Sequence, residues 1–177
     1  GDGTVETDYN IHIDESMPEP LRIGLQCQID ARFANVTYFG RGPVENYSDR
    51  KDGLMLGTYS SSAKGLMTQY VYPQENGNRC DVNWVTVTDK TNHGLKITAL
   101  EQPINISTWD TTQDELEKSG HIGEYKILED SFTLNIDHDQ IGVGGSDSWS
   151  KKSIASDPYR LLDKEYRYRF SIAPKNR

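Results

Sequence analysis

Apolar and polar residues alternate at a period of two through most of this 177-residue sequence, and this pattern restricts its possible folds more than any other feature. A strand turns successive side chains to opposite faces, so such alternation is typical of strands with one buried face. In the run from Thr4 to Ile13, for example, Val5, Tyr9 and Ile11 fall on one side. Comparable runs occupy residues 21–30, 36–39, 82–87, 95–100, 104–107, 132–136 and 166–172. The pattern predicts a chain built mainly of strands.

One short helix is predicted by its capping residues. Thr112 can accept a hydrogen bond at the start of a helix, Glu115 follows three residues later, and Gly120 supplies a stop. We therefore expect a helix over about residues 113–119. One short helix among many strands is typical of an all-β sandwich or barrel, and the length fits a single domain over residues 1–177.

Three segments lack a strand pattern and are expected to be irregular. Residues 60–65 are rich in serine and are interpreted as a loop. Residues 40–53 and 73–79 are rich in glycine, proline, asparagine and charge, yet Tyr47 and Tyr72, in or beside them, are aromatics of a kind expected to be buried. Long ordered loops are often functional or packed against a partner, and both interpretations stay open.

The composition excludes several classes of partner. With 19 Lys and Arg against 27 Asp and Glu, the net charge of −8 argues against nucleic acid. No apolar run is long enough to cross a membrane, and the N-terminus lacks the basic start and apolar segment of a signal peptide. Neither membrane insertion nor a signal peptide is expected, and the compartment stays open between cytoplasm and periplasm. Cys27 and Cys80 are interpreted as buried free thiols.

Four blocks of sequence, in a fixed order, carry a resemblance to a known family. They cover residues 20–28, 38–50 (with Gly-Arg-Gly-Pro-Val-Glu-Asn-Tyr-Ser-Asp-Arg), 70–80, and 134–137 followed by 141–150. Together they resemble the C-terminal domain of glycoside hydrolase family 2 β-galactosidases. The resemblance implies a β-supersandwich of the galactose mutarotase type, here as a partial domain without its N-terminal portion.

The same resemblance implies a role without catalytic residues. The family domain packs against a separate TIM barrel that hydrolyses terminal β-galactosides, and the barrel also binds the Mg and Na ions of the whole enzyme. This chain has no counterpart of the barrel's paired glutamates or metal ligands, so no catalytic residue and no cofactor is expected in it. The expected partners are the barrel and other domains of the same polypeptide, the β-galactoside substrate and, for the full-length enzyme, further copies of itself.

The resemblance places two residues at the substrate, Trp149 and, beside it, Asp147. An indole face packs well on the apolar face of a sugar ring, and the surrounding Gly, Ser and Asp residues favour an exposed turn. The alternative for a tryptophan is burial in the core, which we expect for Trp84 and Trp109 on their strand-like runs.

Other polar groups allow a structural and a functional interpretation. Glu45, Asn46, Asp49 and Arg50, with Glu75, Asn76 and Arg79, are expected to pin irregular loops by hydrogen bonds, and a sugar site is the alternative. Asp137-His138-Asp139 is interpreted as a turn between strands rather than a metal site, since further ligands at a suitable spacing are missing.

Two other functions remain open from the sequence. The chain can be a separate small subunit of a heteromeric β-galactosidase. It can also be a stand-alone carbohydrate-binding or aldose-epimerase-like sandwich, which would require a histidine and a carboxylate for acid–base catalysis.

Overall fold

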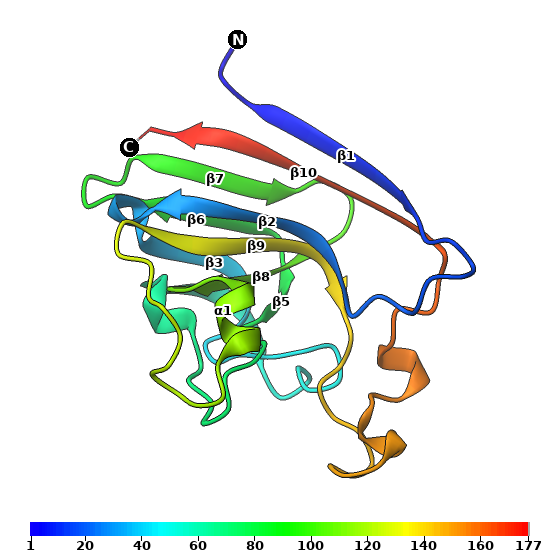
Figure 1. The fold of residues 1–177 in the computed structure, drawn as a ribbon. Coiled ribbons are helices and arrows are strands. Elements are labelled where there is room, and N and C mark those ends of the chain that lie inside the picture. Colours follow the sequence, from blue (N-terminus) through cyan, green and yellow to red (C-terminus); the bar gives the residue numbers. More distant parts are fainter. Residues whose placement is uncertain (177) are drawn as a thin grey trace.

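The computed structural model describes residues 1–176 and shows two antiparallel sheets, which confirms the predicted all-β sandwich (Figure 1). Arg177, the last residue of the predicted domain, lies outside the described residues. The six-stranded sheet has the order β1-β10-β7-β6-β3-β4, and the four-stranded sheet has the order β2-β9-β8-β5. The strands are β1 (Val5–His12), β2 (Arg22–Asp30), β3 (Asn35–Gly42), β4 (Met55–Ser62), β5 (Arg79–Val82), β6 (Trp84–Thr88), β7 (Gly94–Ala99), β8 (Ile104–Trp109), β9 (Ser131–Gln140) and β10 (Glu165–Lys175).

The hydrophobic core lies between the two sheets and receives alternate side chains from both. In β10, Tyr168 and Phe170 are buried, whereas Arg167 and Arg169 point outward and form ion pairs with acidic neighbours. The opposite sheet contributes Ile104, Ile106, Phe132, Leu134 and Ile136. Because alternation determines which side chains enter this core, the period-two pattern located most strands correctly.

The outer face of the four-stranded sheet is polar, and its part on β8 and β9 is buried. Gln26 Nε2 donates to Asn135 Oδ1 at 2.9 Å, and Asn135 Nδ2 donates to Ser107 Oγ at 2.8 Å. Asn135 and Ser107 have no exposed surface. Buried amides and hydroxyls need such partners, so this layer links three neighbouring strands by side-chain hydrogen bonds.

The predicted helix is present as α1 (Gln113–Lys118), and its cap forms as expected. The Thr112 hydroxyl accepts a hydrogen bond from Glu115 N at 3.3 Å. Leu116 of α1 is buried against Trp109, which is itself fully buried at the end of β8. The predicted burial in the core is thus confirmed for Trp109. It is wrong for Trp84, which is only half-buried and has Lys96 Nζ at 5.6 Å from its ring centroid.

Several predictions on local structure are wrong. Residues 40–42 and 79, which were expected to be irregular, belong to β3 and β5. Residues 60–62 are not a loop but the end of β4, which pairs with β3 from Asn35↔Ser62 to Gly42↔Met55. Residues 137–139 are not a turn but part of β9, because Arg22 neutralises the Asp137 carboxylate within the sheet. Tyr72, which was expected to be buried, is 62% exposed.

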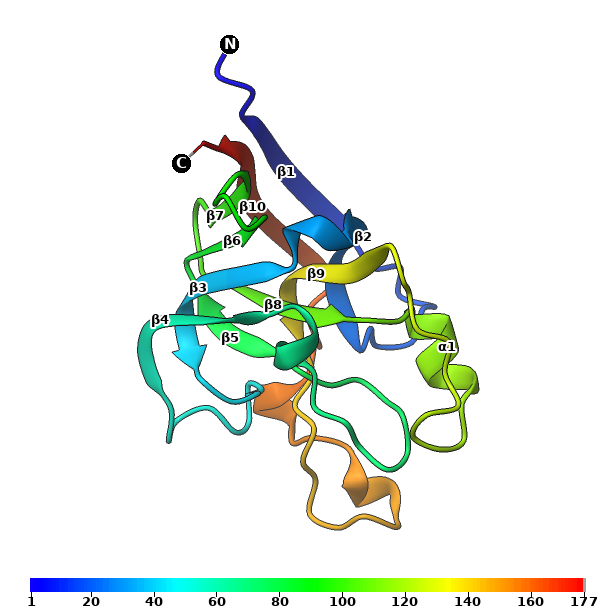
Figure 2. The same ribbon diagram turned by 90° about the vertical axis from the view of Figure 1, so that its left-hand side faces the viewer.

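Three long segments gather at the end of the sandwich opposite the marked termini (Figures 1 and 2). They are the β3–β4 loop (43–54), the segment before β5 (67–78) and the segment after β9 (141–164). Both views show the last segment, in orange, projecting beyond the sheets. These loops contain most of the residues that the sequence singled out.

Candidate functional site

Trp149 projects from the segment after β9 and is 87% exposed. Asp147 forms the turn that precedes it, because Asp147 Oδ1 accepts hydrogen bonds from Trp149 N at 3.1 Å and Ser150 N at 2.8 Å. Asp147 Oδ2 also accepts from Ser150 Oγ at 2.7 Å, and these bonds lower the pKa of the carboxyl. The carboxylate is therefore engaged within its own loop, and its contact with a substrate stays a prediction, as does that of Trp149.

The Trp149 loop is joined to the β3–β4 loop by Asp49. Asp49 Oδ1 accepts from Val143 N at 3.2 Å and Asp49 Oδ2 accepts from Gly144 N at 2.7 Å. A Cβ at position 142 would lie 2.6 Å from Asp49 Cγ, so only glycine fits this close approach. The contact places the predicted polar cluster and Trp149 in one assembly.

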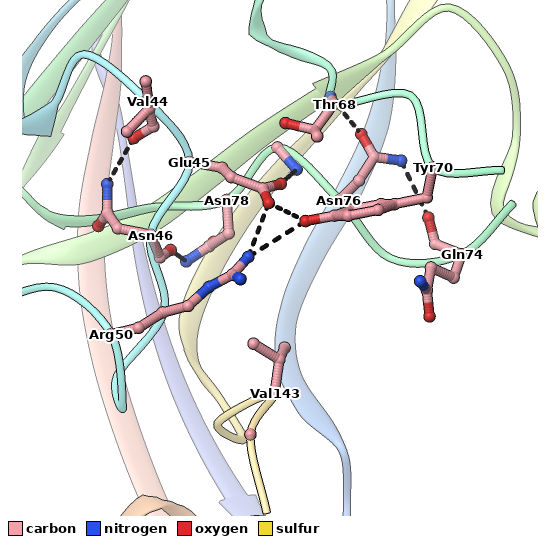
Figure 3. Close-up of polar contacts among 12 residues, drawn as sticks. Val44, Glu45, Asn46, Arg50, Thr68, Tyr70, Gln74, Asn76, Asn78 and Val143 are labelled. Carbon is pink, nitrogen blue, oxygen red and sulfur yellow. Dashed lines mark hydrogen bonds and ion pairs between the residues drawn. The ribbon is translucent and has the colours of Figure 1, made fainter. Parts of the chain in front are cut away.

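Glu45 joins the β3–β4 loop to the segment before β5 (Figure 3). Its carboxylate accepts hydrogen bonds from the Tyr70 hydroxyl, from Arg50 Nη2 at 2.7 Å and from Gly77 N at 2.8 Å. Burial alone would raise its pKa, but the bonds from Tyr70 and Gly77 and the Arg50 charge outweigh burial and lower it. Glu45 is thus an ionised anchor between two loops.

Asn46, Asn76 and Arg79 pin the same loops, as the sequence predicted. Asn46 Oδ1 accepts from Cys80 N at 2.8 Å, and Asn46 Nδ2 donates to Val44 O at 3.0 Å. Asn76 Oδ1 accepts from Thr68 N at 3.1 Å. Arg79 is buried and donates to backbone oxygens, including Gly77 O at 2.7 Å. These contacts hold the β3–β4 loop and the segment before β5 to each other and to β5.

A second polar cluster, not predicted from the sequence, lies around Arg22. Its Nε donates to Asp137 Oδ2 at 2.9 Å and its Nη1 donates to Glu75 Oε2 at 3.1 Å. The guanidinium also lies 5.2 Å from the Trp109 ring centroid. Gly24 is required beside it, because a Cβ there would overlap the Asp137 carboxylate. Arg22, Glu75 and Asp137 are far apart in sequence. The only signal in the sequence is that each lies in one of the four blocks that resemble the known family.

Burial dominates the electrostatics of this cluster. It raises the pKa of Glu75 to about 7 and that of Asp137 to about 6, although the Arg22 charge acts in the opposite direction on both. One guanidinium thus faces two carboxyls beside a cleft of about 390 Å³ that Leu116 and Ile141 also line. Since both carboxyls bond to the same guanidinium, the arrangement is an ion-pair network that ties β2 to β9 and to the segment before β5.

No group of three or more His, Cys, Asp or Glu side chains in residues 1–176 is placed to hold a metal ion. No helix among these residues has the length and apolar character needed to span a membrane. Cys27 and Cys80 are free thiols; Cys80 is buried, as expected, whereas Cys27 is only partly buried.

Comparisons with known proteins agree with the sequence resemblance. The chain is 36% identical over 175 residues to a protein named beta-galactosidase from Priestia megaterium, and 37% identical over 175 residues to one from Lactococcus lactis. These matches cover 98% and 97% of this chain but only 16% of each relative. A beta-galactosidase from Leuconostoc mesenteroides is 41% identical over 154 residues, which are 87% of this chain and 14% of that protein.

The chain therefore spans about a sixth of the length of the relatives it matches. The family model described as beta galactosidase small chain matches residues 1–172, nearly the whole described sandwich. The chain belongs to the beta-galactosidase small chain family.

Proposed function

We propose that this chain is a non-catalytic domain of a larger glycoside hydrolase family 2 β-galactosidase that hydrolyses terminal β-galactosides. The observation that carries the proposal is the coverage: relatives named beta-galactosidase match 97% to 98% of this chain with 16% of their own length. The catalytic carboxylates, and the Mg and Na ions implied by the family resemblance, are assigned to the barrel outside this chain.

In this proposal the domain braces the barrel and presents Trp149 to the sugar or its aglycone. The 87% exposure of Trp149 supports this role, because a flat apolar ring left in water gains by packing against a ligand or partner. The Asp147 turn supports it further, since two hydrogen bonds from backbone N–H groups and one from the Ser150 hydroxyl hold the turn that carries the indole.

The test is Trp149→Ala in the full-length enzyme. We expect roughly a tenfold loss in kcat/KM for a β-galactoside, as removal of an aromatic contact worth about 1.4 kcal/mol would give. The melting temperature should not change, since the side chain packs on little of its own domain. Tyr72→Ala, which removes another exposed aromatic ring, is the matched control. Unchanged kinetics in Trp149→Ala would overturn the role of this residue.

A second candidate, a separate small subunit of a heteromeric β-galactosidase, is favoured by the family description itself, which reads "small chain". The sandwich and the Trp149 loop would have the same task in that assembly, but the barrel would belong to another polypeptide.

A further inference from the structure

The Asp49 carboxylate forms a two-point clamp on the loop that carries Trp149. Each of its oxygens accepts one backbone N–H from successive residues, Val143 at 3.2 Å and Gly144 at 2.7 Å. Charge-assisted hydrogen bonds of this kind are stronger than neutral ones, and two of them fix direction as well as distance. The absence of a Cβ at Gly142 and at Gly144 lets the carboxylate lie directly against this backbone.

The base of the clamp is rigid. Asp49 lies in a tight turn in which Arg50 N donates to Tyr47 O at 2.9 Å. Tyr47 is 1% exposed, and the Arg50 guanidinium lies 4.9 Å from its ring centroid. The same guanidinium donates a hydrogen bond to Glu45. Because this turn is held to the sandwich, the Asp49 carboxylate fixes the backbone of Val143 and Gly144 relative to the sandwich.

The other end of the clamp leads directly to the indole. Between Gly144 and Trp149 the backbone is held by Ser146 N, which donates to Lys152 O at 2.7 Å, and by the Asp147 turn. Gly142 N donates to Tyr159 O at 2.8 Å on the other side. Apart from Asp49, the hydrogen-bond partners of residues 143–150 in the described part of the chain all lie within residues 147–153. Without Asp49 the direction of the Trp149 ring would therefore be less restricted.

We propose that Asp49 is a positioning residue that fixes the Trp149 loop to the sandwich and so orients the indole for the sugar. The inference rests on the proposed function of Trp149. Ordering the loop before the substrate arrives removes part of the entropy loss that binding would otherwise carry. A small misplacement of a contacting group can reduce turnover strongly, so the effect of Asp49 should be visible in kinetics.

The experiment is a double-mutant cycle in the full-length enzyme with Asp49→Ala, Trp149→Ala and the combined variant. We expect Asp49→Ala to lower kcat/KM for a β-galactoside roughly tenfold and to cause little further loss when Trp149 is already alanine. Hydrogen exchange of the backbone amides of residues 143–150 should become faster in Asp49→Ala. Asp52→Ala is the matched control, because it removes an exposed carboxylate from the same loop.

The outcomes separate the two proposals. If Trp149→Ala has normal kinetics, the proposed function of Trp149 fails. If Trp149→Ala is impaired but Asp49→Ala is normal, or if the two losses multiply fully, the positioning role of Asp49 is overturned. Should Asp49→Ala not fold, Asp49→Asn completes the cycle: it keeps the size of the side chain but turns an amide N–H toward a backbone donor, so the same coupling with Trp149 is expected.

Discussion

At the residue scale, single polar side chains decide how the loop end is held, and these were only partly predictable. The cluster of Glu45, Asn46 and Arg79 could be predicted because Glu45 and Asn46 lie in a loop whose buried backbone must find partners, and Arg79 directly follows another such loop. The pairing of Arg22 with Glu75 and Asp137 could not, since one sequence gives no signal for contacts between distant strands and loops.

The Glu75 carboxyl predicts a pH dependence of stability. Its pKa is about 7 in the folded chain, above the ordinary value of 4.5 that we expect in the unfolded chain, so the folded state holds its proton more tightly. Its stabilising contribution is complete below pH 4.5 and is lost as the pH rises to about 7, because the unfolded chain then ionises more readily. Asp137 changes stability in the same direction, with a folded pKa of about 6.

We therefore expect Glu75→Gln to flatten the fall in unfolding free energy between pH 4.5 and about 7, without abolishing it, because Asp137 still titrates. The measurement is denaturant unfolding of the full-length protein at a series of pH values. Hydrogen exchange of the β9 amides reports the unfolding of this domain. Glu15→Gln, at an exposed carboxyl, should leave the slope unchanged. If the unfolding free energy falls with pH equally steeply in the wild type and in Glu75→Gln, the raised pKa of Glu75 is contradicted.

At the element scale, eight of the ten strands were predicted from their alternating pattern, and β4 and β5 were missed. The short strand β5 follows an irregular segment and gives no alternating run of its own, although its Val82 lies in the core. β4 is an edge strand with small residues, and it is held by pairing with β3, for example by the 2.9 Å hydrogen bond between Thr37 Oγ1 and Ser60 Oγ. β9 ends in acidic residues, which are typical of a turn, but Arg22 forms an ion pair with one of them, Asp137, within the sheet. In both β4 and β9, contacts with neighbouring strands and side chains determine the structure more than the local sequence does.

The short helix α1 depends on its cap more than a long helix would. Its six residues cannot form a stable helix alone, so the Thr112 hydroxyl and the packing of Leu116 must both contribute. We expect Thr112→Ala to cost about 1 kcal/mol of local stability, because Glu115 N then loses its acceptor. Faster hydrogen exchange of α1 amides would show this. Thr112→Ser keeps the acceptor and should exchange like the wild type; equal rates in all three would refute the cap.

At the scale of the whole molecule, the sandwich places Trp149 and the polar residues that hold its loop at one end, and in the proposed function the chemistry belongs to a part of the protein outside this chain. Asp49 and Glu45 tie the loops at this end to each other, and Trp149 projects beyond them. The fold alone does not imply an activity, since one sandwich architecture serves many functions. The proposed activity depends on whether the barrel is joined to this chain covalently, held as a subunit, or absent.

An immunoblot of native cell extract beside a β-galactosidase activity stain separates these possibilities. Because the matched region is only 16% of the relatives' length, we expect antibody to this chain to detect, on a denaturing gel, a polypeptide far above 20.0 kDa. On a native gel the same band should coincide with the activity. A 20.0 kDa denatured band that still comigrates with native activity would establish the separate-subunit form, whereas a 20.0 kDa band apart from all activity would contradict both and leave a stand-alone sugar-binding sandwich.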